Sequence, residues 1–198
     1  MKGTRLRRLF YRPDELVVGY DEGVLQPQDI RRVRDIAPIP LRTMPFRRGE
    51  PDPGAPVLLT LGSFGGREDL SVLEALGSEQ WREVWRRIAG ALAAAVQPPL
   101  RTMVRFNYRR VIIRGDVQAA TPEDLINALT QLPLLAKSAV EAAEGLPPET
   151  QLLTARFDPQ AGQWILESAY GYQGRKWVRR FDSAREEWVE MRERQGSS

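Results

Sequence analysis

The side chains best suited to chemistry gather in one stretch, RTMVRFNYRRVIIRG, which is residues 101–115. It holds five arginines, one phenylalanine and one tyrosine, and it holds no acid. Guanidinium groups bind phosphates and carboxylates, and aromatic rings stack on unpaired bases with roughly 1–3 kcal/mol per base. The stretch therefore predicts either a nucleic-acid surface or a surface for a protein partner, unless its charges only face water.

Alternation along the stretch favours a β-hairpin over a nucleic-acid reader. Val104, Phe106 and Tyr108 point one way, as core residues do, and the arginines between them point the other way. One strand of this length would be unusually long, so a turn near residues 107–110 is expected. The candidate surface residues are Arg101, Arg105, Phe106, Tyr108, Arg109, Arg110 and Arg114.

The chain contains neither cysteine nor histidine. Disulfides, thiolate chemistry, Ser-His or Cys-His nucleophiles and zinc sites with imidazole ligands are therefore excluded. A carboxylate-only Mg²⁺ or Ca²⁺ site stays open, but the paired acids at 14–15, 21–22 and 186–187 are adjacent in sequence. Adjacent side chains on a strand point to opposite faces, so no shared ligand is expected. We expect no enzyme, no cofactor and no metal site.

A glycine-rich segment, GSFGGR at residues 62–67, follows a predicted strand and precedes a helix. Such backbone could cradle a phosphate. The segment lacks the Lys-Ser/Thr of a Walker A sequence and the spacing of a dinucleotide fingerprint. A flexible turn is the expectation.

The charge balance ranks the possible partners. The net charge is +3, and arginine supplies 26 of the 29 basic residues. Proteins that neutralise phosphates usually carry a stronger basic excess, so a protein partner is favoured over nucleic acid. No apolar run reaches the ~18 residues of a membrane span, and the basic N-terminal residues lack an apolar run of signal-peptide length, so a cytoplasmic protein without a membrane partner is expected.

The first quarter of the chain predicts two strands, a helix and a connector. Two short strands are expected at 5–11 and 15–21, joined by a turn at 12–14. A helix at 27–36 has Pro27 in its first turn. Residues 38–56 contain six prolines and predict an extended connector without regular structure.

The middle of the chain predicts a strand, two principal helices and the hairpin. The apolar run 57–61 is typical of a buried strand. Ser78 is expected to cap a helix whose apolar residues recur at helical spacing and which ends at Pro98. Thr121 caps a second helix, which Pro133 kinks or ends and which continues to Gly145.

The last third contains an internal repeat with an offset of 24 residues. RFDPQAGQWILE (156–167) aligns with RFDSAREEWVEM (180–191). The alignment favours two hairpins with aspartate-led turns, stacked as an antiparallel meander. A capping-box pattern from Ser183 to Glu186 leaves a helix over 183–194 open as the alternative.

The sequence thus predicts the α+β class. A mixed N-terminal layer with two principal helices would fill residues 1–150, with the Pro-rich loop at 38–56. A C-terminal antiparallel β-meander, residues 151–194, would pack on this layer or form a small subdomain.

The order of elements over 57–132 resembles a known family. A strand enters a glycine-rich turn (VLLTLGSFGG), a helix ends in small residues (WRRIAGALAAAV), and a basic hairpin (VRFNYRRVIIRG) leads to a helix opened by TPEDL. This order is similar to the effector-associated constant component domain of bacterial conflict systems. The resemblance implies a non-catalytic adaptor that couples to an effector or another complex subunit, and it assigns no residue a role.

We therefore expect a non-enzymatic adaptor or assembly subunit that binds a protein through exposed arginines and aromatic residues. The alternative is a nucleic-acid-binding subunit that uses the basic hairpin at 101–115.

Overall fold

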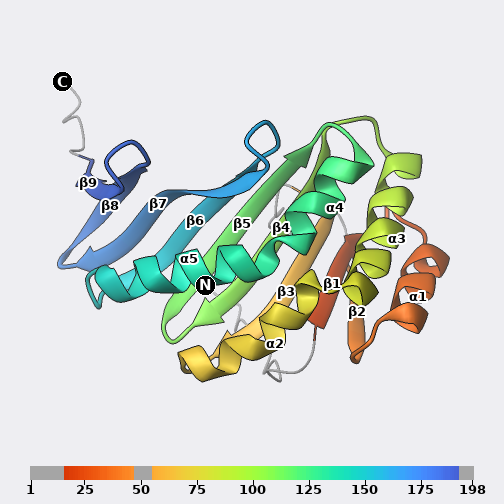
Figure 1. Cartoon of the computed structure of the whole chain (residues 1–198), viewed down its shortest axis with the longest axis horizontal. Coiled ribbons are helices and arrows are strands. Elements are labelled where there is room, and N and C mark those ends of the chain that lie inside the picture. The colour runs from red at the N-terminus through yellow and green to blue at the C-terminus, as the bar shows by residue number, and fades with distance from the viewer. Residues whose placement is uncertain (1–15, 47–54, 192–198) are drawn as a thin grey trace, which may run out of the picture.

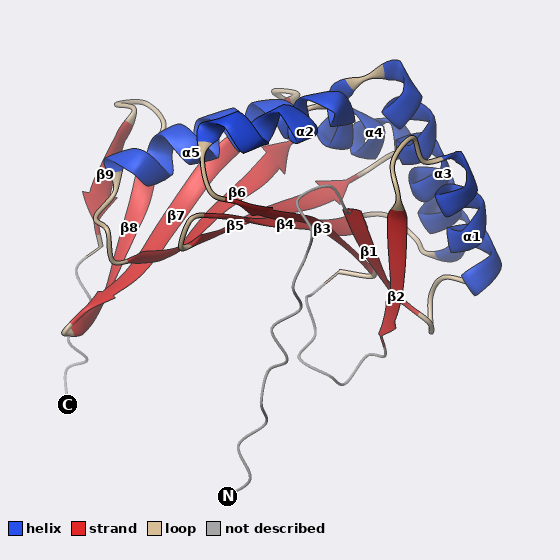
Figure 2. Cartoon of the chain, turned by 90° about the horizontal axis from the view of Figure 1, so that it is seen from below, coloured by secondary structure: helices blue, strands red, loops and turns tan. Residues whose placement is uncertain are grey.

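A mixed sheet of nine strands carries helices on one face in the computed structural model, which describes residues 16–46 and 55–191 (Figures 1 and 2). The strands are β1 (Leu16–Asp21), β2 (Leu41–Phe46), β3 (Val57–Phe64), β4 (Leu100–Tyr108), β5 (Val111–Ala119), β6 (Thr150–Asp158), β7 (Gln163–Gln173), β8 (Arg175–Asp182) and β9 (Glu187–Glu190). The helices are α1 (Pro27–Ile36), α2 (Ser71–Glu74), α3 (Glu79–Ala95), α4 (Pro122–Thr130) and α5 (Leu132–Gly145), with short 3₁₀ turns at Arg67–Leu70 and Ala75–Gly77.

The strand order is β2-β1-β3-β4-β5-β6-β7-β8-β9. Three neighbouring pairs are parallel, namely β1–β2, β3–β4 and β5–β6, and a helical segment connects each of them. The other five pairs are antiparallel. Helices and largely antiparallel strands therefore share one fold, which confirms the predicted α+β class.

The core lies between the helices and the face of the sheet that they cover. Alternate strand residues such as Val18, Leu59, Val104 and Leu153 are fully buried there. The apolar residues of α3 that recur at helical spacing belong to the same core. Trp85, one of them, is 0 % exposed. The opposite side of the sheet carries none of the five helices (Figure 2), and we call it the open face.

Part of the proline-rich segment departs from the expectation of a connector without regular structure. Residues 41–46 form β2, which pairs in parallel with β1, and Leu41 is buried. Because β2 is an edge strand, Pro45 can lack its N–H without breaking an internal ladder. The predicted strand at 5–11 and the turn at 12–14 lie outside the described residues.

The predicted helix boundaries are confirmed at several points. The helix at 27–36 begins at Pro27, and α3 begins after Ser78, although the Ser78 side chain makes no capping hydrogen bond. The Thr121 hydroxyl accepts a hydrogen bond from the backbone N–H of Asp124 at 3.2 Å. Pro133 stands in the first turn of α5, where the chain bends between α4 and α5.

The C-terminal repeat forms two similar hairpins, so the strand prediction for 183–194 is confirmed over the described part of that segment. Phe157 pairs with Trp164 in the first hairpin, and Phe181 pairs with Trp188 in the second. In each pair the rings are in contact, with centroids 5.6 and 5.1 Å apart. Because β6 also pairs with β5, the meander continues the same sheet.

The two hairpin turns differ at one equivalent position. Gly162 has φ of 64°, and Glu186, 24 residues later, has φ of 55°. This left-handed conformation costs a residue with a side chain about 1 kcal/mol, and glycine adopts it freely. Glu186→Gly is therefore expected to raise the free energy of unfolding by up to about 1 kcal/mol in urea titrations. The matched control is Gly162→Ala, which should lower it, because no atom lies within 4 Å of the added Cβ and only the backbone cost changes.

Candidate functional site

The hairpin arginines occupy two different places. Arg101, Arg105 and Arg114 lie on the open face, because their strand neighbours are buried beneath the helices. Arg109 and Arg110 form the two-residue turn between β4 and β5. The sequence therefore predicted the hairpin, although each strand is longer than expected and the turn is tighter.

The two aromatic candidates do not belong to any surface. Phe106 and Tyr108 are each 1 % exposed, and both side chains point toward the helices. Phe106 packs edge-on against Phe64, with centroids 6.1 Å apart. These rings are core residues that cannot stack on a base, so they are removed from the candidate surface.

One row of side chains crosses the open face from β3 to β8. Residues that face each other directly in the register share one face of the sheet. Followed from strand to strand, the register joins the members of what we call the donor row: Thr60, Arg105, Arg114, Thr154, Ser168 and Arg180. Every member can donate a hydrogen bond and none is acidic, and at ~4.8 Å per strand the row spans roughly 24 Å.

An apolar row runs beside the donor row on the same face. It consists of Ile112, Leu152, Tyr170 and Val178, which pair in this order across β5 to β8. All four side chains are half-buried in the structure. A band of apolar and aromatic side chains next to arginines is the composition found at protein interfaces.

Ion pairs neutralise some of the open-face arginines. The Asp116 carboxylate accepts hydrogen bonds from Nε of Arg114 at 2.9 Å and from its Nη2 at 3.1 Å. Arg156 contacts Glu167 at 3.0 Å. Within 16–46 and 55–191, Arg101 and Arg105 have no ion-pair partner.

A pocket of about 420 Å³ opens among these groups. The charged residues that line it are Arg101, Arg114, Asp116, Arg156 and Glu167. It therefore presents three guanidinium groups and two carboxylates, with one positive charge in excess. This pocket and the two rows make up the candidate site.

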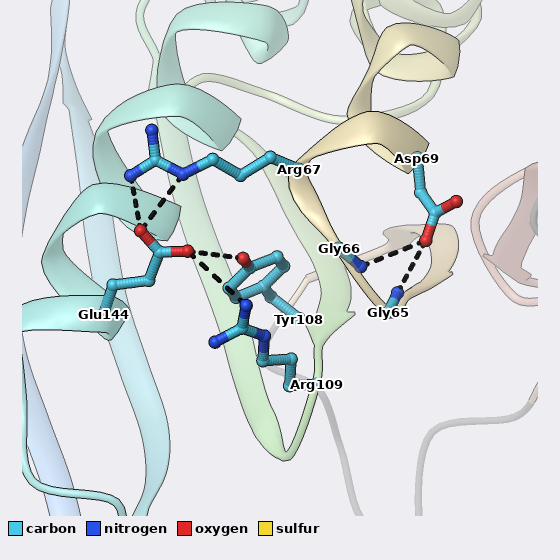
Figure 3. A network of polar contacts seen from close by, with 7 residues as sticks. All are labelled: Gly65, Gly66, Arg67, Asp69, Tyr108, Arg109 and Glu144. Carbon is cyan, nitrogen blue, oxygen red and sulfur yellow. Dashed lines mark hydrogen bonds and ion pairs between the residues drawn. The ribbon is translucent and has the colours of Figure 1, made fainter.

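A second polar cluster holds the tip of the hairpin to the end of α5 (Figure 3). The Glu144 carboxylate accepts hydrogen bonds from Nε of Arg67 at 3.0 Å and from the Tyr108 hydroxyl at 2.6 Å. Arg109 approaches the same carboxylate at 3.8 Å and lies over the Tyr108 ring. The hydrogen bond from Arg67 is the main cause, and the one from Tyr108 the next, of a pKa of Glu144 that is lowered to about 2.

The pKa of Tyr108 is raised, mainly because the side chain is buried and next because its hydroxyl bonds to Glu144.

The lowered pKa of Glu144 predicts a pH-dependent contribution to stability. Its ordinary value is 4.5, so the contribution is complete above about pH 5 and is lost as the pH falls toward about 2. Glu144→Gln should therefore unfold at a lower urea concentration than wild type at pH 7, and the gap should close toward pH 2. Urea midpoints of both proteins at pH 7, 5, 4 and 3 measure this difference. A difference that stays constant with pH would contradict a stabilising role for the Glu144 charge.

The glycine-rich segment is not open to a phosphate. The backbone N–H groups of Gly65 and Gly66 donate to the Asp69 carboxylate at 2.8 and 3.1 Å (Figure 3). An anion there would have to displace a carboxylate of the protein itself. Asp69 is four residues beyond Gly65, so the sequence offered a signal for this turn.

Among the described residues, no group of three or more acidic side chains could hold a metal ion, and no helix is long and apolar enough to cross a membrane. No protein-family model matches the chain, and searches of curated proteins and of solved structures found no match either.

Proposed function

We propose that the protein is a non-enzymatic adaptor or assembly subunit that binds another protein on the open face of its sheet. The observation that carries this proposal is the apolar row beside the donor row. Four half-buried apolar side chains in line would form the water-excluding centre of an interface. The arginines next to them would supply directional contacts at its rim.

Charge supports a protein partner over nucleic acid. Arg114 and Arg156 are each bound to a carboxylate of the chain, which leaves a mixed surface instead of a continuous positive one. A phosphate backbone would meet Asp116 and Glu167 as well as the arginines. The two rings that the sequence predicted to stack on bases, Phe106 and Tyr108, are buried in the core, and Tyr170 is the single aromatic ring of the apolar row.

The expected cytoplasmic location and the expected kinship with effector-associated constant component domains belong to this proposal. The element order on which the resemblance rests, from β3 through α3 and the β4–β5 hairpin to α4, is present in the fold. A partner that is an effector or another complex subunit follows from this resemblance.

Partner capture from the native host tests the proposal. Tagged wild type is compared with a Leu152→Gln/Val178→Gln variant, which makes the apolar row polar. The control is Leu134→Gln, since Leu134 is 59 % exposed on α5 in the helical layer. Each capture is repeated after nuclease treatment, and thermal melts confirm that all three proteins are folded.

We expect one or a few proteins, near equal stoichiometry, to be retained by wild type and by the control and to be lost from the double variant. Retention of the same proteins by all three would contradict the proposal. Loss of every captured protein after nuclease treatment would point to the nucleic-acid alternative.

A further inference from the structure

We propose that the open face binds an extended acidic segment of the partner, with two carboxylates four residues apart that are received by Arg101 and Arg105. This inference rests on the proposed function and specifies the chemistry of the partner at the same site.

The two arginines are available for an external anion. Both side chains are exposed, and neither forms an ion pair within the described ranges. Arg105 also stands directly opposite Arg114 in the β4–β5 register. Because Asp116 pairs with Arg114, the charge of Arg105 is the one left without an ion pair at this position of the register among the described residues, and an external carboxylate would neutralise it.

The pocket beside Arg101 is suited to a single carboxylate. Asp116 already binds Arg114, and Glu167 already binds Arg156, so Arg101 supplies the unpaired charge of the lining. One carboxylate would neutralise it and could accept two parallel hydrogen bonds from its guanidinium group. A dianion such as a phosphate monoester would bring excess negative charge toward both acids of the pocket.

The spacing of the two arginines defines the geometry of the ligand. They are four residues apart on one strand and share a face, so their Cα atoms are about 13 Å apart at ~3.3 Å per residue. An extended segment lying along β4 has the same rise, which places its carboxylates at positions i and i+4. A helix would need carboxylates about nine residues apart to span this distance at ~1.5 Å per residue.

A titration with short peptides tests the inference. The probe is a capped pentapeptide with glutamate at its first and fifth positions and serine or threonine between them. Binding is followed by NMR, through the Nε–Hε signals of the arginines. The comparison probes are the same peptide with glutamine in place of glutamate, a peptide with glutamates two positions apart, and an oligothymidylate.

We expect saturable shifts of the Arg101 and Arg105 signals with the first peptide. Affinity should fall about tenfold in Arg101→Gln and in Arg105→Gln, since each removes one charged hydrogen-bonding partner. It should be unchanged in Arg31→Gln/Arg32→Gln, which removes exposed arginines from α1 in the helical layer. The closely spaced peptide should bind more weakly and the glutamine peptide should not bind.

Absence of saturable binding, equal affinity for both glutamate spacings, or tighter binding of oligothymidylate would each overturn the inference. Failure of the proposed function is recognised separately. If the peptide fails but the Leu152→Gln/Val178→Gln variant still loses its captured protein, only the acidic ligand is wrong. If that variant keeps its protein, the assignment of the open face is wrong whatever the peptide does.

Discussion

Gly115→Val is expected to lower the free energy of unfolding by about 1–3 kcal/mol, the usual cost of overpacking a core. Gly115 lies on β5 between Arg114 and Asp116, and it faces the helices. A Cβ atom there would lie 2.8 Å from Cζ3 of Trp164 and 3.0 Å from Cδ2 of Leu135. Either the ring or α5 must move to accommodate it. Urea unfolding of the purified variant measures the loss.

The ring has little freedom to move away, because the indole N–H of Trp164 donates to the backbone carbonyl of Ala128 at 3.1 Å. The matched control is Gly90→Ala. Gly90 is an exposed position of α3 with no atom within 4 Å of an added Cβ. That substitution should raise stability by about 0.5–1 kcal/mol, as alanine does in a helix interior. Equal stability of Gly115→Val and wild type would mean that Trp164 does not pack against β5 as described.

The alternation of residue types along the chain was enough to predict which side chains of the hairpin enter the core. Val104, Phe106 and Tyr108 follow the two-residue period of a strand, and all three are buried. Because this period decides orientation, the same pattern argued against Phe106 and Tyr108 as surface residues. They stayed in the candidate set only because their aromatic type suits base stacking.

The candidate site itself was beyond prediction, because it depends on register between distant segments. Arg114 lies opposite Thr154 in the parallel β5–β6 pair, although the two residues are 40 positions apart in the sequence, and nothing local to either strand sets that alignment. A slip of one residue would move Thr154 to the helical face. The Glu144 cluster has the same origin, since it joins the segment after β3, the hairpin tip and the end of α5.

The prediction from proline content was wrong for part of the proline-rich segment. Because prolines are rare in internal strands, residues 38–56 were expected to form a connector without regular structure. The strand β2 forms in it because an edge position requires only one bonded side, and β1 provides the partner. The hairpins of the C-terminal repeat were predicted correctly, because the phenylalanine and tryptophan that pair in each hairpin are close enough in sequence to fix its register.

Trp85→Ala should have the largest effect on stability, a loss of about 3–5 kcal/mol. Trp85 of α3 is fully buried in the core, and its ring stacks on Trp81 with centroids 5.0 Å apart. Its indole N–H donates to the backbone carbonyl of Leu76 at 3.0 Å, which fixes the short helical segment before α3. Removal of the ring therefore leaves a cavity and an unpaired carbonyl group.

Trp85→Phe separates these two losses, because it keeps an aromatic ring and removes the donor. It should cost about 1–3 kcal/mol, the penalty for an unsatisfied buried polar group plus a smaller cavity. Leu134→Ala, at an exposed site on α5, is the control and should stay within about 0.5 kcal/mol of wild type. Urea unfolding followed by circular dichroism measures all three. If Trp85→Phe were as damaging as Trp85→Ala, the hydrogen bond to Leu76 would outweigh the packing of the ring, and the short helical segment before α3 would be held to α3 chiefly by that one polar contact.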